Sequence, residues 1–253
     1  MPEQFLHGVE VVEIDSGPRP IQTLKSSVIG LVGTAPNADS EVFPINSPVL
    51  IAGQHILAAK LGEGGTLPAA MDDIFDQVGA MVVVVRVDEG LNDAETLSNV
   101  IGGVDVQTGQ YQGIQALLGA SSDVHVTPRI LIVPEFTHHA AVANELLSVA
   151  ERLRAVVIAD GPNTNDSEAI NYRQLFGSAR LYLVDPWVRV WDIQTNVEVM
   201  RPASGRVAGL LAKSDSERGF WYSPSNQELR GFCLLYTSPS PRDQRGSRMP
   251  SSA

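Results

Sequence analysis

The sequence is poor in the residues on which several common functions depend. It holds a single cysteine, Cys233, in 253 residues, which excludes a disulfide framework within the chain and a zinc site built from several thiolates. Its 18 lysines and arginines are outnumbered by 29 aspartates and glutamates, and the basic residues form no cluster along the sequence. Because proteins bind nucleic-acid phosphates through such clusters, we expect no nucleic-acid partner.

Long apolar runs are missing too. None approaches the roughly 20 residues that a helix needs to cross a bilayer. The N-terminal segment MPEQFLHGVE lacks the basic and apolar blocks of a signal peptide. We therefore expect no membrane insertion, and synthesis and retention in a cytoplasm.

The chain also lacks common motifs for nucleotide binding and catalysis. It has neither the G-x-x-x-x-G-K-[ST] loop that cradles phosphate nor the G-x-S-x-G elbow of α/β hydrolases. Gly62, Gly64 and Gly65 do not have the spacing of a dinucleotide-binding loop. His138 and His139 are adjacent and point in different directions on a helix, where we expect them to cap its start. The sequence therefore predicts no cofactor and no metal.

Asp160 follows an apolar segment with the pattern of a strand, a position where α/β enzymes often hold a catalytic carboxylate. It also precedes Gly161 and Pro162, and Asp is a common turn residue. We prefer the interpretation of Asp160 as a turn residue. No catalytic residue is predicted, so we expect the chain not to be an enzyme.

Strand and helix patterns alternate along the middle of the chain, which is 43% hydrophobic overall and can form a core. The expected strands lie within residues 26–36, 47–53, 80–87, 127–136, 155–162 and 179–193, the last broken at Asp185-Pro186. The expected helices lie within residues 67–79, 138–155 and 165–176, the third capped by Asp166 or Ser167. This alternation predicts an α/β fold with a mixed sheet and helical crossovers.

The first 20 residues have the composition of an extended N-terminal arm. Residues 8–16 alternate apolar and acidic side chains with one slip, as a short strand with a bulge does. The apolar residues expected to dominate docking of this arm on another subunit are Val9, Val11, Val12 and Ile14. A hinge that excludes regular structure is expected to follow, at Gly17, Pro18 and Pro20.

Residues 21–232 are expected to form one α/β core, with the glycine-rich segment 88–126 as a looser excursion or inserted subdomain. From Cys233 onward the sequence is rich in Ser, Pro and Arg and has no apolar period. Its segment CLLYTSPSPRD resembles the conceptual translation of a transposon-based sequencing adapter. We therefore expect residues 233–253 to be a non-native, disordered tail and the core to be incomplete at its C-terminus.

Residues 201–226, RPASGRVAGLLAKSDSERGFWYSPSN, combine charges and glycines as a catalytic or phosphate-binding loop does. Their apolar spacing instead predicts a packing helix that starts near Ser204, in which Gly205 and Gly209 admit a neighbouring backbone. Gly219 is expected to end this helix in the left-handed conformation. The charged residues near its end that we expect to pair with another surface are Asp215, Glu217 and Arg218.

The same stretch resembles the signature of contractile tail sheath proteins from phages with P2-like tails and from related phage-tail-like bacteriocins. In that family a Pro-x-Ser-Gly-x-Val-Ala-Gly start, an Asp-x-x-Arg-Gly-x-Trp middle and a Pro-x-Asn end recur. The matching residues are Pro202, Ser204, Gly205, Val207, Ala208, Gly209, Asp215, Arg218, Gly219, Trp221, Pro224 and Asn226. The resemblance covers residues 5–232, and family members continue well beyond this point.

This resemblance implies a structural subunit of a phage or bacteriocin tail. Such subunits form homo-oligomers, stacked as hexameric rings around a tail tube, and contract without nucleotide to drive the tube through the host envelope. The implied partners are further copies, the tail tube protein, and the baseplate and tail terminator proteins; the implied location is the virion tail, after assembly in the host cytoplasm. Two alternatives stay open, a type VI secretion sheath component and an α/β enzyme with an unrecognised site.

Overall fold

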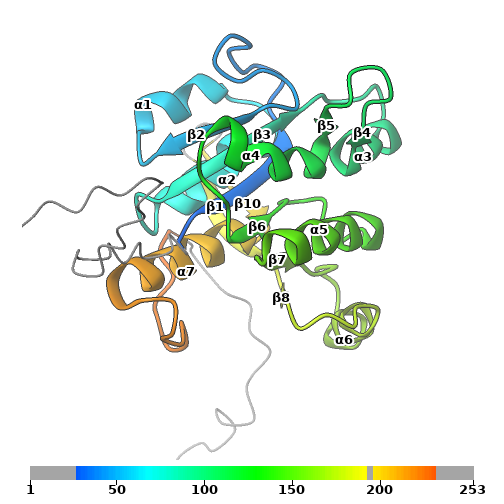
Figure 1. Cartoon of the computed structure of the whole chain (residues 1–253). Helices are drawn as coiled ribbons and strands as arrows, with labels where there is room; N and C mark the ends of the chain where they lie inside the picture. Colours follow the sequence, from blue (N-terminus) through cyan, green and yellow to red (C-terminus); the bar gives the residue numbers. More distant parts are fainter. Residues whose placement is uncertain (1–26, 193–195, 232–253) are drawn as a thin grey trace, which may run out of the picture.

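A six-stranded mixed sheet forms the centre of the computed structural model, which describes residues 27–192 and 196–231. The strand order is β2-β3-β1-β6-β7-β8 (Figure 1). Five strands run parallel: β1 (Ile29–Thr34), β3 (Met81–Val87), β6 (Ile130–Ile132), β7 (Val156–Asp160) and β8 (Leu181–Val184). The edge strand β2 (Pro48–Ala52) runs antiparallel to β3. The predicted α/β class with a mixed sheet is confirmed.

The continuously apolar run of β3 is explained by helices on both faces of the sheet. Val83 and Val85 point into one core cluster, and Val82 and Val84 point into the other. Successive side chains of a strand point to opposite faces, so a strand covered on both sides has no polar positions to spare. The run of consecutive apolar residues in β3 therefore follows from the burial of both faces of the sheet.

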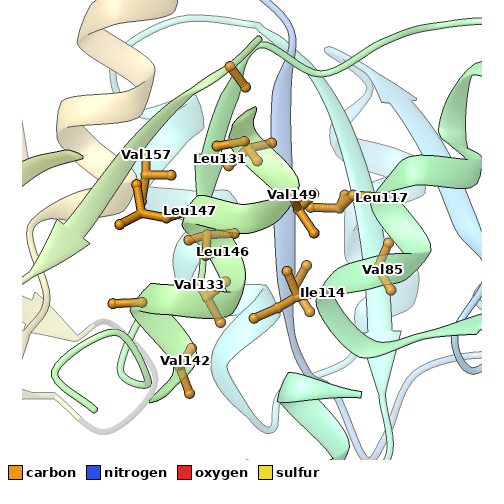
Figure 2. Packing of buried hydrophobic residues seen from close by; sticks show 14 of the residues in the cluster. Val85, Ile114, Leu117, Leu131, Val133, Val142, Leu146, Leu147, Val149 and Val157 are labelled. Carbon is orange, nitrogen blue, oxygen red and sulfur yellow. The ribbon is translucent and has the colours of Figure 1, made fainter. Parts of the chain in front are cut away.

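The first face of the sheet is covered by α5 (Ala140–Leu153), α3 (Asp93–Ile101), η2 (Gly113–Gly119) and α4 (Ala120–Asp123). Figure 2 shows Leu146, Leu147 and Val149 of α5 packed with Leu131 and Val157 of the sheet. Within residues 88–126, Val100, Ile114 and Leu117 are fully buried in this same cluster, while a hairpin of β4 (Gly103–Val104) and β5 (Tyr111–Gln112) projects outward.

The second face is covered by α2 (Thr66–Phe75) and α7 (Ser204–Arg218), with α1 (His55–Ala58) and η1 (Ala59–Leu61) beside them. Two reciprocal hydrogen bonds fix the start of α2 to the end of β1. The Thr34 N–H donates to the Thr66 hydroxyl over 3.1 Å, and the Thr66 N–H donates to the Thr34 hydroxyl over 3.3 Å. These two hydrogen bonds hold the start of α2 in place, and with it the face of α2 that packs against α7.

The chain leaves the main sheet after β8. The break predicted at Asp185-Pro186 is confirmed, because β8 ends at Val184 and β9 (Val188–Asp192) pairs instead with β10 (Val197–Arg201) in a separate antiparallel ladder. The second strand of this ladder ends at Arg201, shortly before α7 begins at Ser204. The predicted cap of α6 (Asp166–Gln174) is wrong: Asn165 is the N-cap, and its side chain accepts a hydrogen bond from the Glu168 N–H over 2.9 Å.

Candidate functional site

The stretch that resembles the sheath signature folds as α7, which lies across the second face of the sheet. Gly205 and Gly209 face α2 at close range. A Cβ atom at Gly209 would lie 2.9 Å from the carbonyl oxygen of Ile74, and one at Gly205 would lie 3.2 Å from the Asp73 Cβ. Ala208 and Ala212 are buried against the sheet. The small residues thus bring α7 against the backbone of α2 within the same chain.

A buried arginine joins the two helices. Arg206 is 1% exposed, and its Nη2 lies 2.6 Å from Oδ1 of Asp73 in α2. Its Nη1 lies 3.0 Å from Oδ2 of Asp76, which is half exposed. Burial raises the pKa of Asp73 to about 6, against the lowering effect of Arg206 and Arg201. A charge buried this deeply is stable only when it is paired, so each partner requires the other.

The same arginine also holds the chain beyond α7. Arg206 Nη1 donates to the carbonyl oxygen of Arg230 over 2.5 Å. The side-chain amide of Gln77 pairs with the backbone of Arg230 in both directions, over 2.9 Å and 3.0 Å. Gly231 then adopts a φ of +79°, with no room for a Cβ between Arg206 and Asp76. Arg230 and Gly231 are therefore held in place by α7 and by the end of α2 together.

The start of α7 is bound by Asp160 at the end of β7. Asp160 is fully buried, and its carboxylate accepts hydrogen bonds from the Ser204 N–H over 2.9 Å and the Ser204 hydroxyl over 2.7 Å. Thr137 donates from its hydroxyl over 3.4 Å, and its hydroxyl accepts the Asp160 N–H over 2.8 Å. Burial raises the pKa of Asp160 to about 7, against the lowering effect of these hydrogen bonds.

This geometry extends the turn interpretation of Asp160. The residue does end β7 before Gly161, but its side chain also ties β7 to α7 across the core. Ser204 and Asp160 are each 0% exposed, so a substrate cannot reach the serine hydroxyl. A nucleophile must touch its substrate, so the pair acts as a structural contact in this conformation.

A depression of about 1010 Å³ lies beside this joint, between α2 and the β9–β10 ladder. Part of its charged lining is paired internally: Arg201 lies 3.8 Å from Asp73 and 3.7 Å from Asp192. Within residues 27–192 and 196–231, no three His, Cys, Asp or Glu side chains are grouped as metal ligands. In the same ranges no helix is long and apolar enough to cross a membrane.

The far end of α7 has different surroundings. Asp215 is half-buried, and Glu217 and Arg218 are exposed at the end of the helix. Gly219 ends the helix with φ +95° and ψ 152°, so its φ is positive as expected but its conformation is not left-handed helical. The Trp221 ring lies against this glycine, where a Cβ would approach it to 2.5 Å, yet Trp221 is 71% exposed. Phe220 and Tyr222 are exposed beside it.

The structure thus brings together part of the predicted site. Ser204, Gly205 and Gly209 form the buried joint, and Asp215, Glu217, Arg218, Gly219 and Trp221 lie at or beyond the outer end of α7. The arm and hinge residues, Val9 to Pro20, lie outside the described residues. Sequence reasoning missed Arg206, Asp73 and Gln77. The signal for Arg206 was a charged residue placed between the small residues of the packing face.

Family models match most of the chain. The phage tail sheath protein central domain matches residues 109–247, and the domain III N-terminal region of tail sheath protein Gp18 matches residues 26–87. These two segments contain every strand of the main sheet, since β1 to β3 lie in one and β6 to β8 in the other. The chain therefore belongs to the phage tail sheath protein family.

Two relatives show how close this membership is. The chain is 42% identical over 228 residues to a prophage major tail sheath protein of Pseudomonas aeruginosa (strain UCBPP-PA14), covering 90% of this chain and 58% of the relative. It is 42% identical over 236 residues to the tail sheath protein of Escherichia phage P2, covering 90% and 59%. The chain thus spans a little under three fifths of the length of these relatives.

Solved structures share the fold. The sheath complex of an extracellular contractile injection system, PVC, in its contracted state has a TM-score of 0.62 at 14% identity, covering 96% of this chain and 60% of that chain. The helical sheath of the anti-feeding prophage in its contracted state has a TM-score of 0.56 at 18% identity, covering 94% and 61%. Relatives and structural neighbours are contractile sheath proteins, and the predicted resemblance is confirmed.

Proposed function

We propose that this chain is the core of a structural subunit that polymerises as the sheath of a contractile phage tail. The observation that carries this proposal is the 42% identity to tail sheath proteins over 90% of the chain. By analogy with the family, the complete protein forms hexameric rings stacked around the tail tube, bound at its ends to baseplate and terminator proteins. It is assembled in the host cytoplasm and resides in the virion tail.

Contraction of such a sheath needs no enzyme. In the proposed mechanism the extended polymer is metastable, and rigid subunits rotate and slide into a lattice with better contacts, which releases the work that drives the tube. The α2–α7 joint supports this role because a buried ion pair and a close helix approach resist deformation while subunits move. We therefore propose that the protein performs no bond-making chemistry and takes no cofactor.

Extended arms are proposed to keep subunits connected during this movement. A strand added to a neighbour's sheet holds through main-chain hydrogen bonds while a flexible hinge bends. Residues 8–16, with Val9, Val11, Val12 and Ile14, followed by Gly17, Pro18 and Pro20, have the composition for such a strand and hinge. Head-to-tail contacts of this kind produce open helical assemblies.

The experiment is to express the complete protein with its tube protein and to look for sheaths by electron microscopy. Val11→Pro, which removes a main-chain donor within the arm, is expected to abolish tube formation and to leave the thermal unfolding of the subunit unchanged. Glu3→Pro, outside the predicted strand, is the control and should assemble normally. Normal sheaths from Val11→Pro would contradict the arm assignment, and failure of the unmodified protein to assemble would contradict the function.

A further inference from the structure

Five arginines come together at one edge of the main sheet, although the sequence shows no basic cluster. Arg129 directly precedes β6, Arg154 precedes β7 and Arg180 directly precedes β8. Because these strands are parallel, their starts lie along the same edge. Arg152 and Arg173 lie in the last turns of α5 and α6, the helices that lead back to this edge. We call these five residues the arginine edge.

Contacts with backbone carbonyls orient three of these side chains but do not neutralise them. Arg129 donates to the Leu153 carbonyl over 2.5 Å, and Arg180 donates to the Ala155 carbonyl over 3.3 Å. Arg173 donates to two further carbonyls, at 2.8 Å and 3.2 Å. In the described part of the chain the ion pairs involve other residues, namely Lys60, Arg189, Arg201 and Arg206. The arginine edge therefore keeps its positive charge.

Exposed apolar side chains lie among these arginines. Val156, the first residue of β7, is 42% exposed, and Leu175, the C-cap of α6, is 64% exposed. Protein interfaces combine apolar contacts with arginine and are depleted in lysine. The edge thus has the composition of a docking surface for an acidic protein surface.

The opposite end of the sheet supplies such a surface on the same chain. Asp88 and Glu89 directly follow β3, and Asp93 and Glu95 lie in the first turn of α3. All four are exposed. We call them the acidic cluster. Since β3 is parallel to β6, β7 and β8 through β1, this cluster lies at the strand ends remote from the arginine edge.

Helix dipoles explain only part of this separation of charge. Cations at helix C-termini and anions at N-termini are stabilising, which accounts for Arg152, Arg173, Asp93 and Glu95. The same effect applies to Arg154, the C-cap of α5. The remaining residues of both patches lie outside the helices, beside the ends of strands: Arg129, Arg180, Asp88 and Glu89.

We propose that the arginine edge docks a second copy of this chain by binding its acidic cluster head to tail. We infer the partner from charge. The chain carries a net charge of −11, so the basic arginine edge is complementary in charge to the rest of the same chain. Two different patches at opposite ends form a heterologous contact, which adds copies in one direction without closing. The inference rests on the proposed sheath function and deepens it by naming the surfaces in contact.

The experiment measures self-association of the purified chain by sedimentation velocity. Association is expected at about 10 mM salt, where the Debye length is about 30 Å, and loss of association at about 1 M salt, where it is about 3 Å. Arg152→Glu with Arg154→Glu, and separately Asp88→Lys with Glu89→Lys, should each weaken association at least about tenfold. The variant with all four changes should recover part of the association, because the two reversed positions on each patch again face the opposite charge.

Controls separate the surface from folding and from net charge. Lys60→Glu with Arg189→Glu makes the same change in charge at exposed sites elsewhere and should associate like the unmodified chain. Arg152→Gln with Arg154→Gln should weaken association less than reversal while keeping the same unfolding midpoint. If charge reversal perturbs folding, the variant with Arg152→Gln and Arg154→Gln is used for the test instead.

Three results with the purified chain would overturn the inference. They are a chain that stays monomeric at low salt, a fourfold variant that is folded but does not recover, and binding of a labelled RNA duplex by the arginine edge in place of self-association. The inference and the function fail separately. Complete protein carrying Arg152→Glu and Arg154→Glu that still forms sheaths would refute the docking surface alone, and unmodified protein that forms none would refute the function.

Discussion

The two halves of α7 meet opposite surroundings. In the first half, Ser204 and Arg206 are buried, and Gly209 approaches the backbone of α2. After Ser214 the helix emerges from the core, and an exposed aromatic cluster around Trp221 follows its end. A single stretch of sequence therefore serves packing at one end and is largely exposed at the other. Changes in the two halves should separate stability from assembly.

The largest effect is expected from removing the buried cation. Arg206→Met leaves the Asp73 carboxylate buried without its closest partner, and such a change costs about 3–5 kcal/mol. Chemical denaturation of the purified chain measures this loss. Arg189→Met is the control, because its ion pair with Glu198 is about half exposed and should contribute about 0–1 kcal/mol. Equal losses in the two variants would show that Arg206 does not hold the joint.

A smaller loss is expected from filling the close approach of the helices. Gly209→Val places a side chain where the Ile74 carbonyl is 2.9 Å from the Cβ position, and overpacking of this kind costs about 1–3 kcal/mol. The shift of the denaturation midpoint provides the measurement. Ser216→Val, on the exposed part of the same helix, controls for the helix propensity of valine. A stable Gly209→Val variant would mean that α7 can move away from α2 at no cost.

The smallest effect on stability is expected at the other end of α7. Trp221→Ala removes a side chain that is 71% exposed, and exposed substitutions usually change the free energy of unfolding by less than about 0.5 kcal/mol. Sheath assembly of the complete protein should nevertheless be weakened, because Trp221 belongs to the predicted interface motif. Electron microscopy measures sheath assembly, and thermal unfolding of the same variant measures stability. Loss of stability without loss of assembly would reverse the assignment of the two ends.

Local features of the fold were predictable because they depend on neighbouring residues. The strands around residues 81–87 and 156–160 follow from apolar, β-branched runs, and the helix of residues 140–153 follows from its apolar spacing. The start of α7 at Ser204 was predicted in the same way. The cap of α6 was missed by one residue, because Asn165 and Asp166 are both good capping residues and only the backbone conformation decides between them.

The site was less predictable because its contacts join distant parts of the chain. Ser204 and Asp160 are 44 residues apart, and Arg206 and Asp73 are 133 apart. Periodicity placed Asp160 at the end of a strand but did not show which helix would meet it. The sequence likewise gave no sign that Gln77 would bind the backbone of Arg230.

By itself the sequence determined the α/β alternation, the small residues that make α7 a packing helix, and the membership of the sheath family. All three depend on patterns of residues that lie close together along the chain. Only the tertiary structure decided the strand order, the burial of Arg206 between Asp73 and Asp76, and the gathering of the arginine edge. The physical reason is that the strand order and the packing of helices on the sheet set which charges meet, and neither can be read from local periodicity.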